Sequence, residues 1–468
     1  MSTIVSAFKD KSAIKAADLK HRKTINYNIG RYNAVVPVGK GQFDDVHFAR
    51  EKAKNIKWKA LESLDVHLEK FEKNFLQRGG KVIWAENAEQ ACEAVLKICR
   101  EKHCKTLVKS KSMVTEEIHL NDFLAKHHIE SIESDLGEYI QQLDGEPPYH
   151  IVTPAMHKSK EDCARVFNEH LGTPLDLSPE ELTLVAREKL RKKYTEAEVG
   201  ITGANFIISE TGSIAITENE GNARLSAAWP KTHIVITGIE KVLPNLQDLS
   251  LFWPLLATYG TGQQITVYNS IISGPRQLNE HDGPEEMYVI LLDNGRTQIL
   301  QDPVSRESLY CIRCGACLNA CPVYKNIGGH SYGTTYSGPI GSVITPNLKD
   351  LGEWKHLSHA SSLCGNCTEV CAVKINLHEL LLHNRREAVR SGQGNMMEKI
   401  AWSAWQQGML HRKLMNLGNS KLKNWMINKV FKGWNRHRSD LQFPEKTFNQ
   451  LWMEKRAASA STAETIPS

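Results

Sequence analysis

Seven of the eleven cysteines lie between Cys311 and Cys371, in two short runs. The first run has the spacing C-x2-C-x2-C-x3-C, with Gly315 inside it and Pro322 directly after it. In bacterial ferredoxins this spacing binds a [4Fe–4S] cluster, because three thiolates two residues apart on a tight loop can each reach a different iron. The fourth thiolate, before the proline, serves a neighbouring cluster. The first run therefore predicts cluster ligands at Cys311, Cys314, Cys317 and Cys321.

The second run has the spacing C-x2-C-x3-C and supplies the ligands that a pair of clusters still needs. Crossed ligation is the rule in two-cluster ferredoxins, so the last cysteine of each run belongs to the other run's cluster. We expect two [4Fe–4S] clusters. Cluster one is expected on Cys311, Cys314, Cys317 and Cys371, and cluster two on Cys321, Cys364 and Cys367.

The second run departs from the usual pattern at two positions. Ser361 stands where a first cysteine is usual, and Ala372 stands where a proline is usual. Cluster two therefore has three predicted thiolates, and its fourth iron could be held by water, by the Ser361 hydroxyl or by His359. A labile fourth iron or a [3Fe–4S] cluster is the alternative. A missing thiolate lowers the negative charge around the cluster and should shift its potential.

A structural zinc site is the other interpretation of these runs, since zinc also uses C-x2-C pairs. Zinc sites rarely combine C-x2-C-x2-C with a fourth cysteine before proline, so the spacing favours iron–sulfur clusters. The remaining cysteines have no ligand spacing, and we expect them to be buried, inert thiols: Cys92, Cys99, Cys104 and Cys163.

The composition is that of a soluble globular protein. The chain has 468 residues, of which 41% are hydrophobic and 24% charged, and this length predicts two to four domains. The longest apolar stretch, 249–257, is broken by Pro254, so no transmembrane helix is expected. The N-terminus has no secretion signal, which predicts a cytoplasmic protein with free thiols. No G-x-G-x-x-G follows a predicted strand, so a dinucleotide is expected on a partner or not at all.

The elements that position the cysteines follow from the hydrophobic pattern. Residues 1–43 show no clear periodicity and predict an extended N-terminal arm. Residues 44–78 carry apolar side chains at helical spacing and predict one long helix ended by Gly79 and Gly80. Helical stretches such as 88–102 then alternate with short strands, predicted at 81–84, 106–108, 132–133, 150–153, 206–209 and 289–293.

This alternation predicts an α/β domain over 44–296, with a largely parallel sheet and helices on both faces. The loop 209–212 predicts a hairpin, and Asp293-Asn294-Gly295 ends the last strand. The cysteine module is expected over 297–392 and a helical, basic, Trp-rich region over 393–456. A disordered tail is expected over 457–468.

Five stretches of the chain resemble a known family. They are LVKSKSMVTEEIHLN (107–121), ESDLGEYIQQL (133–143), VGITGANFIISETGSIAITENEGNARL (199–225), YVILLDNGR (288–296) and YKNIGGHSYGTTYSGPIGSV (324–343). Together with the cysteine runs, they resemble the iron–sulfur subunits of the bacterial L-lactate utilization system, lactate utilization protein B. The resemblance extends from about residue 44 to 456. It implies an LUD domain with the parallel sheet of sugar-phosphate isomerases and CoA-transferases, then an α-helical ferredoxin-type module and a helical C-terminal region.

The resemblance also implies a function. The system oxidises L-lactate to pyruvate and supports growth on lactate, with two partners: a second LUD protein and a protein rich in Cys-Gly motifs. The seven cysteines match the family's cluster ligands. Electron transfer to a downstream acceptor, rather than substrate conversion, is the role implied for this chain. Two alternatives stay open: a stand-alone lactate-binding enzyme that uses an open iron of cluster two, and an iron–sulfur regulatory or nucleic-acid-binding protein.

Candidate substrate residues lie in two loops of the α/β domain, 209–213 and 217–222. Glu210 and Glu220 stand there beside small residues whose amides could meet a ligand, and Arg224 could hold a carboxylate through a bidentate contact. Lys109 and Lys111 follow a predicted strand and are possible further contacts. The alternative is that the glycines form turns and the charges are solvated. His330 is a candidate to shield a cluster or donate to a sulfur.

The C-terminal region carries the chain's excess positive charge. Residues 399–456 hold twelve Lys or Arg against three Asp or Glu, a net charge of +9 where the whole chain has +5. Five of the ten tryptophans also lie there. The region could be a helical cap with a solvated charged face. It could instead dock on the partner subunits or on an anionic membrane surface as a peripheral contact. Nucleic acid binding is not expected, because no recognised motif accompanies the charge.

Overall fold

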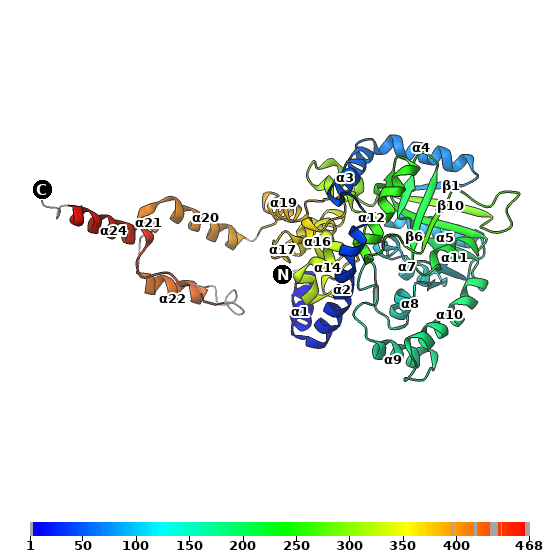
Figure 1. Cartoon of the computed structure of the whole chain (residues 1–468), viewed down its shortest axis with the longest axis horizontal. Coiled ribbons are helices and arrows are strands. Elements are labelled where there is room, and N and C mark those ends of the chain that lie inside the picture. The colour runs from blue at the N-terminus through cyan, green and yellow to red at the C-terminus, as the bar shows by residue number, and fades with distance from the viewer. Residues whose placement is uncertain (1–2, 395, 416–418, 431–438, 441, 464–468) are drawn as a thin grey trace. The chain divides into compact units, whose positions relative to one another are not determined.

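The computed structural model describes residues 3–394, 396–415, 419–430, 439–440 and 442–463. The chain forms two compact units, Met1–Ser391 and Gly392–Ser468. The first unit contains both sheets (Figure 1). It also contains all seven cysteines of the two runs.

The main sheet has six strands in the order β1-β10-β7-β4-β2-β3, and every neighbouring pair is parallel. The strands are β1 (Lys81–Ala85), β2 (Thr106–Lys109), β3 (Glu130–Glu133), β4 (Val199–Thr202), β7 (Thr232–Gly238) and β10 (Glu286–Leu292). Ile234 and Ile236 pack on the same core as Val95 of α5 (Ala88–Glu101), whereas Val235 and Val289 face the opposite core. The predicted parallel α/β sheet with helices on both faces is therefore confirmed.

The second sheet lies against the face that carries Val235. Its strands are β8 (Val242–Leu243), β5 (Phe206–Ile208), β6 (Ser213–Glu218) and β9 (Tyr268–Ile272), in that order. β5 and β6 form the predicted antiparallel hairpin. Its turn contains Gly212 at φ +62°, and a Cβ there would lie 2.4 Å from the backbone nitrogen of Phe75. Glycine at this position therefore lets the hairpin pack directly on a helix.

The N-terminal residues are helical, and the predicted extended arm is wrong. They form α1 (Thr3–Ala17) and α2 (Leu19–Lys40), and the side chain of Asp18 caps α2 by accepting from the backbone N–H of His21. Ile25 and Ile29 of α2 are fully buried. The predicted single helix over 44–78 is two helices, α3 (Val46–Glu62) and α4 (Leu64–Gln77), separated at Ser63.

The remaining helices of the first unit cover the sheets and flank the cysteine loops. In the α/β part they are α6 (Met113–Glu117), α7 (Leu120–Lys126), α8 (Leu136–Leu143), α9 (Lys160–Leu171), α10 (Pro179–Glu196), α11 (Asn222–Ala228), α12 (Leu249–Thr261) and α13 (Arg296–Gln301). In the cysteine module they are α14 (Ala316–Ala320), α15 (Pro322–Ile327), α16 (Gly338–Leu348), α17 (Leu351–His359), α18 (Asn366–Glu369) and α19 (Leu377–Arg390). The predicted strand 150–153 is a loop.

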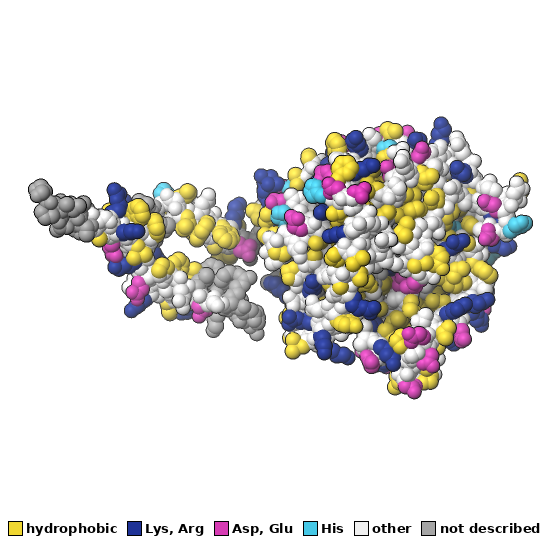
Figure 2. All heavy atoms as spheres, in the orientation of Figure 1, with side chains coloured by type: hydrophobic (Ala, Val, Ile, Leu, Met, Phe, Trp, Pro, Cys, Tyr) yellow, Lys and Arg dark blue, Asp and Glu magenta, His cyan; other side chains and the backbone are white. Residues whose placement is uncertain are grey.

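The second unit contains α20 (Met396–Leu410), α21 (Arg412–Met415), α22 (Ser420–Val430) and α24 (Phe448–Ala463). Figure 2 shows apolar and basic side chains interleaved on the described part of these helices. α24 includes residues 457–463 of the expected disordered tail, and 464–468 lie outside the described residues. Within the described residues, no helix is long and apolar enough to cross a membrane.

Candidate cluster sites and the adjoining cavity

Four of the seven cysteines surround one small cavity in the first unit. Three come from the first run and one from the second, and apolar side chains such as Ile340 and Val373 complete the wall: the cysteines are Cys311, Cys314, Cys317 and Cys371. Arg313 and Gly315 hold the first run in left-handed conformations, with φ of +63° and +81°. A Cβ at Gly315 would lie 2.9 Å from a methyl carbon of Ile151, so this close approach requires glycine.

Backbone amides point at the sulfurs of this group. The N–H of Arg313 donates to Cys311 Sγ at 3.4 Å, and the N–H of Ile375 donates to Cys371 Sγ at 3.3 Å. Burial, followed by the neighbouring thiol of Cys371, raises the pKa of Cys314 to about 12. Four thiolates can therefore share this cavity only with a bound cation, and the buried sulfurs with amide donors fit a [4Fe–4S] cluster.

The other three cysteines form a second group at the surface. Cys321 and Cys367 are close enough that burial and the Cys321 thiol raise the pKa of Cys367 to about 11. The side chain of Asn366 donates to the carbonyl of Ala320 at 3.2 Å, which ties α18 to the end of α14. Cys364 is exposed, and the backbone N–H of Asn366 lowers its pKa.

Two residues are candidates for the fourth ligand of the second cluster, Ser361 and His359. Ser361 lies in the loop before Cys364, and His359 lies where that loop begins. The hydroxyl of Ser361 accepts a hydrogen bond from the N–H of Leu363 at 3.1 Å. His359 is the last residue of α17. Neither observation identifies a fourth ligand, and its identity stays a prediction.

A buried ion network lies beside the first cysteine group. The guanidinium of Arg313 stacks over the ring of Tyr336 at 4.4 Å and lies 3.6 Å from Glu240 Oε1. Arg296 donates to Glu240 Oε2 at 2.6 Å and to both carboxylate oxygens of Glu117, at 3.0 and 2.9 Å. Tyr336 donates to Glu117 Oε2 at 2.5 Å. Glu117 is thus fixed by arginine and tyrosine donors, and Glu240 by an arginine donor.

Two further buried cations belong to this network. Lys57 donates to the carbonyl of Glu240 at 2.5 Å, and burial lowers its pKa to about 7. Burial also lowers the pKa of Lys241 to about 8, while the Cys311 thiolate acts in the opposite direction. Four cationic side chains therefore surround two carboxylates, Glu117 and Glu240. This excess of positive charge complements the negative charge of a thiolate-bound cluster.

A larger cavity of about 530 Å³ adjoins the first cysteine group. Cys314, Arg313 and Ile151 line both cavities. The larger one lies between the α/β domain and the cysteine module, and its wall carries the cationic groups of Lys241 and Arg313. It also carries a separate acidic group: Asp135, Glu218 and Glu220, with Lys111 3.6 Å from Asp135.

Comparison with known proteins decides the family. The LUD domain model matches residues 68–292, and the 4Fe-4S dicluster domain model matches 307–375. Lactate utilization protein B of Bacillus subtilis is 42% identical over 428 residues and covers 89% of each chain. The Anoxybacillus flavithermus protein is 44% identical over 421 residues, covering 87% of this chain and 89% of its own. The Bacillus velezensis protein is 47% identical over 372 residues, covering 79% and 78%.

This chain belongs to the lactate utilization protein B family. It combines an LUD domain, a 4Fe–4S dicluster domain in a helical region and a helical C-terminus, which confirms the predicted fold class. The dicluster match and the thiol-lined cavity agree on an iron–sulfur cofactor.

In this chain, the structure brings together only some of the predicted substrate residues. Glu220 and Lys111 line the larger cavity. Glu210 accepts a hydrogen bond from the N–H of Leu246 at 2.9 Å, and Arg224 is exposed on α11; neither lines the cavity. Lys109 is fully buried, 2.8 Å from Glu133 Oε1, and so acts in an internal ion pair.

Sequence reasoning missed the two cations of the cavity wall. Lys241 ends a short 3₁₀ turn (Ile239–Lys241) after β7 and carries no motif. Arg313 stands inside the first cysteine run, and a charged residue in a buried cluster loop is the signal that could have found it. Among the other cysteines, Cys92, Cys99 and Cys104 are buried as expected, and Cys163 is half-buried.

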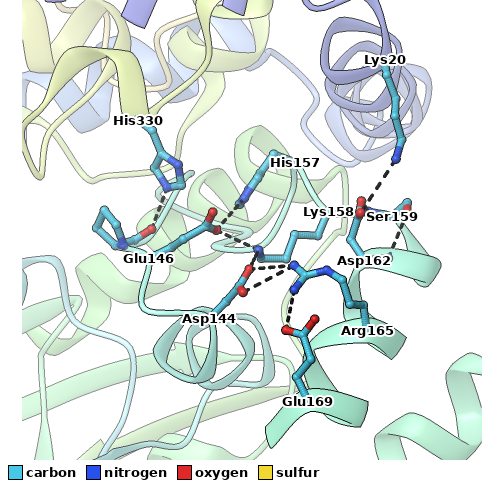
Figure 3. Close-up of polar contacts among 11 residues, drawn as sticks. Lys20, Asp144, Glu146, His157, Lys158, Ser159, Asp162, Arg165, Glu169 and His330 are labelled. Atoms are coloured by element: carbon cyan, nitrogen blue, oxygen red, sulfur yellow. Dashed lines mark hydrogen bonds and ion pairs between the residues drawn. The ribbon is translucent and has the colours of Figure 1, made fainter. Parts of the chain in front are cut away.

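His330 contacts a loop of the LUD domain (Figure 3). Its Nε2 lies 2.7 Å from the carbonyl oxygen of Pro147, so this atom contacts a carbonyl and not a cysteine sulfur. Glu146, His157 and His330 place ligand-type atoms within 4.8 Å of one another. The ammonium of Lys158 lies 2.8 Å from the same carboxylate oxygen of Glu146 that His157 contacts. These residues therefore form an ion-pair network in which Lys158 already balances the charge of Glu146.

Proposed function

We propose that this chain is the iron–sulfur electron-transfer subunit of a protein complex that oxidises L-lactate to pyruvate. The observation that carries the proposal is the regrouping of the cysteines. Cys371 of the second run joins three cysteines of the first run, while Cys321 lies with the second run. This is the crossed arrangement of a two-cluster electron carrier. We infer the substrate, lactate, from the relatives, which are named for lactate utilization.

We assign two [4Fe–4S] clusters to the chain. Cluster one takes four thiolates and cluster two takes three, with the residues as grouped above. Cys317 and Cys321 belong to different clusters but are four residues apart on and just after α14, a rise of about 6 Å along the helix. The two clusters therefore lie close enough to exchange electrons directly.

The protein's own residues supply the environment of that exchange. Oxidation of lactate to pyruvate releases two electrons and two protons, and each cluster when bound can take up one electron. Ile340, Val373 and Ile375 exclude water from cluster one. The amides of Arg313 and Ile375 donate to its sulfurs, and the network around Arg313 and Lys241 balances its charge. Cys364 is exposed, so a cluster that it helps to hold would lie near the surface, where a partner could reach it.

The C-terminal unit is the proposed docking element. The side chains of Trp402, Trp405, Trp425 and Trp452 are each about half exposed or more, among a net positive charge. Exposed tryptophans beside cations are typical of protein interfaces. We assign them to the partner subunits, a second LUD protein and a protein rich in Cys-Gly motifs. Binding of the isolated chain to anionic lipid vesicles, with no affinity for the partners, would replace this assignment by a peripheral membrane contact.

The test is reduction of the clusters by substrate in the assembled system. Anaerobic protein is mixed with the two partners and L-lactate, and the reduced clusters are counted by electron paramagnetic resonance (EPR). We expect lactate to reduce both clusters only when the partners are present. Clusters that stay oxidised in the assembled complex would overturn the proposal.

A second candidate function is supported by the exposure of Cys364 and the absence of a fourth thiolate in the second run. An open iron of cluster two could bind substrate directly, which makes the chain an enzyme by itself. Replacing Ser361 by Cys should then abolish lactate oxidation while the iron content stays the same. Pyruvate release by the isolated wild-type chain would favour this candidate, and unchanged turnover of Ser361→Cys would exclude it.

A further inference from the structure

The cavity of about 530 Å³ beside cluster one has the size of a small-molecule site. It is completed only where the two domains pack together, because Lys241 and Glu220 come from the LUD domain while Arg313 and Cys314 come from the first cysteine run. A molecule bound there would lie against the wall that holds a cluster ligand.

Two cations on this wall have donor groups without a hydrogen-bond acceptor in the described part of the chain, although Arg313 Nη2 also lies 3.6 Å from Glu240 Oε1. Arg313 is buried, and its Nη1 makes no hydrogen bond within the described residues. Lys241 is 6% exposed, and among the described residues its Nζ forms no hydrogen bond and no ion pair. Burying a cationic group without a partner is costly. An anion that enters the cavity could accept a hydrogen bond from the free Nη1 of Arg313 and pair with Lys241.

The acidic side chains of the cavity limit which anion can enter. Asp135, Glu218 and Glu220 line it, with one lysine, Lys111, paired to Asp135. These carboxylates repel a polyanion such as a nucleotide phosphate, and they accept hydrogen bonds from a hydroxyl group. A ligand with one carboxylate and one or more hydroxyl groups satisfies both parts of the wall.

We propose that this cavity binds a small hydroxycarboxylate, with its carboxylate on Arg313 and Lys241 and its hydroxyl toward the acidic side chains. The planar guanidinium suits a bidentate contact with a carboxylate. Apolar residues on the wall, among them Leu256, Ile151 and Val152, shield that contact from water. The proposal rests on the proposed function, since the lactate of that function is the simplest ligand of this class.

Binding is measured on the full-length, cluster-loaded chain under anaerobic conditions. Equilibrium dialysis with labelled L-lactate gives the affinity, and EPR of the reduced protein reports any change at cluster one. We expect saturable binding at millimolar L-lactate, a shifted cluster-one signal and an unchanged cluster-two signal. Inorganic phosphate should compete poorly. Absence of saturable binding, or phosphate competing as well as lactate, would overturn the proposal.

The variants separate the cavity from general charge effects. Lys241→Met should weaken L-lactate binding about tenfold or more, and Arg313→Lys should weaken it while keeping the charge. Arg224→Met removes an exposed cation outside the cavity and should leave binding unchanged. Wild-type affinity in Lys241→Met with normal iron content would contradict the site. Iron content and cluster reduction by dithionite are checked first, so loss of a cluster is separated from loss of ligand binding. Failure of the proposed function is measured separately, as clusters that stay oxidised with L-lactate and both partners.

Discussion

The two cysteine groups approach within four residues in the sequence, at Cys317 and Cys321, but have different surroundings. The first group is buried between two domains, beside four cationic side chains and two carboxylates. The second group includes an exposed thiol, Cys364, and has three cysteines where the first has four. Burial raises the pKa of Cys314, whereas an amide N–H lowers the pKa of Cys364. The difference assigns an inner role, next to the cavity, to cluster one and an outer role to cluster two.

Removing one thiolate from each cluster in turn should reveal the largest difference in stability between the two cysteine groups. Cys317→Ser should lose cluster one and much of the stability of the holoprotein, because four cysteines, three of them buried, lose their common metal group. Cys364→Ser should affect cluster two alone and change stability little. Iron content, EPR and thermal unfolding under anaerobic conditions measure both effects. Equal losses of stability in the two variants would contradict the inner and outer assignment.

The ion network beside cluster one should contribute strongly to stability. Arg296→Met leaves Glu117 and Glu240 buried without their main partner and should lower the free energy of unfolding by about 3–5 kcal/mol. The matched control is Lys193→Met, which removes an exposed ion pair with Glu130 and should cost about 0–1 kcal/mol. Denaturant unfolding of the holoprotein compares the two. A control-sized effect for Arg296→Met would mean that the network is not needed for the fold.

The cationic surroundings should set the potential of cluster one. Reduction adds negative charge, so replacing Lys241 by Met should lower its reduction potential by on the order of tens of millivolts. Cluster two, outside this network, should keep its potential. An EPR-monitored redox titration separates the two signals. A shift of equal size in both clusters would show that the effect is not local.

Glu220 should give the smallest effect, through pH. Burial, followed by the charge of Asp135, raises its pKa to about 7. A raised carboxyl pKa means that the folded state holds the proton more tightly than the unfolded state. Its contribution to stability is therefore complete below about pH 4.5 and is lost as pH rises through about 7. Compared with the wild type, Glu220→Gln should raise the free energy of unfolding more at pH 8 than at pH 5. The difference should be less than about 1 kcal/mol, because the side chain is partly exposed. Identical pH dependence in the two proteins would contradict this.

Local sequence patterns predicted the elements in which apolar residues recur at one regular spacing. The parallel strands and the hairpin at 209–212 are of this kind, and so is the cysteine spacing. α1 could not be predicted in this way, because it has no buried residue and its apolar side chains do not form one stripe. The loop 150–153 contains β-prone residues, but it serves to pack His150 and Ile151 against the cysteine module.

The candidate site was harder to predict than the fold. Cluster ligands lie close together in sequence, so spacing identified them. The cavity wall instead combines Lys241, Arg313 and Glu220, which are separated by tens of residues and meet only through domain packing. Arg224 has the right chemistry for a carboxylate, yet it lies on the exposed side of α11. Electrostatic partners across domains have no local pattern that a sequence can display.

The central claim is that the chain holds two clusters, one buried and one near the surface. Iron and acid-labile sulfide on the anaerobically purified full chain, with EPR before and after dithionite, test it most directly. The account predicts about eight iron and eight sulfide per chain and two reducible signals. About four iron with a single signal, or zinc in place of iron, would contradict it.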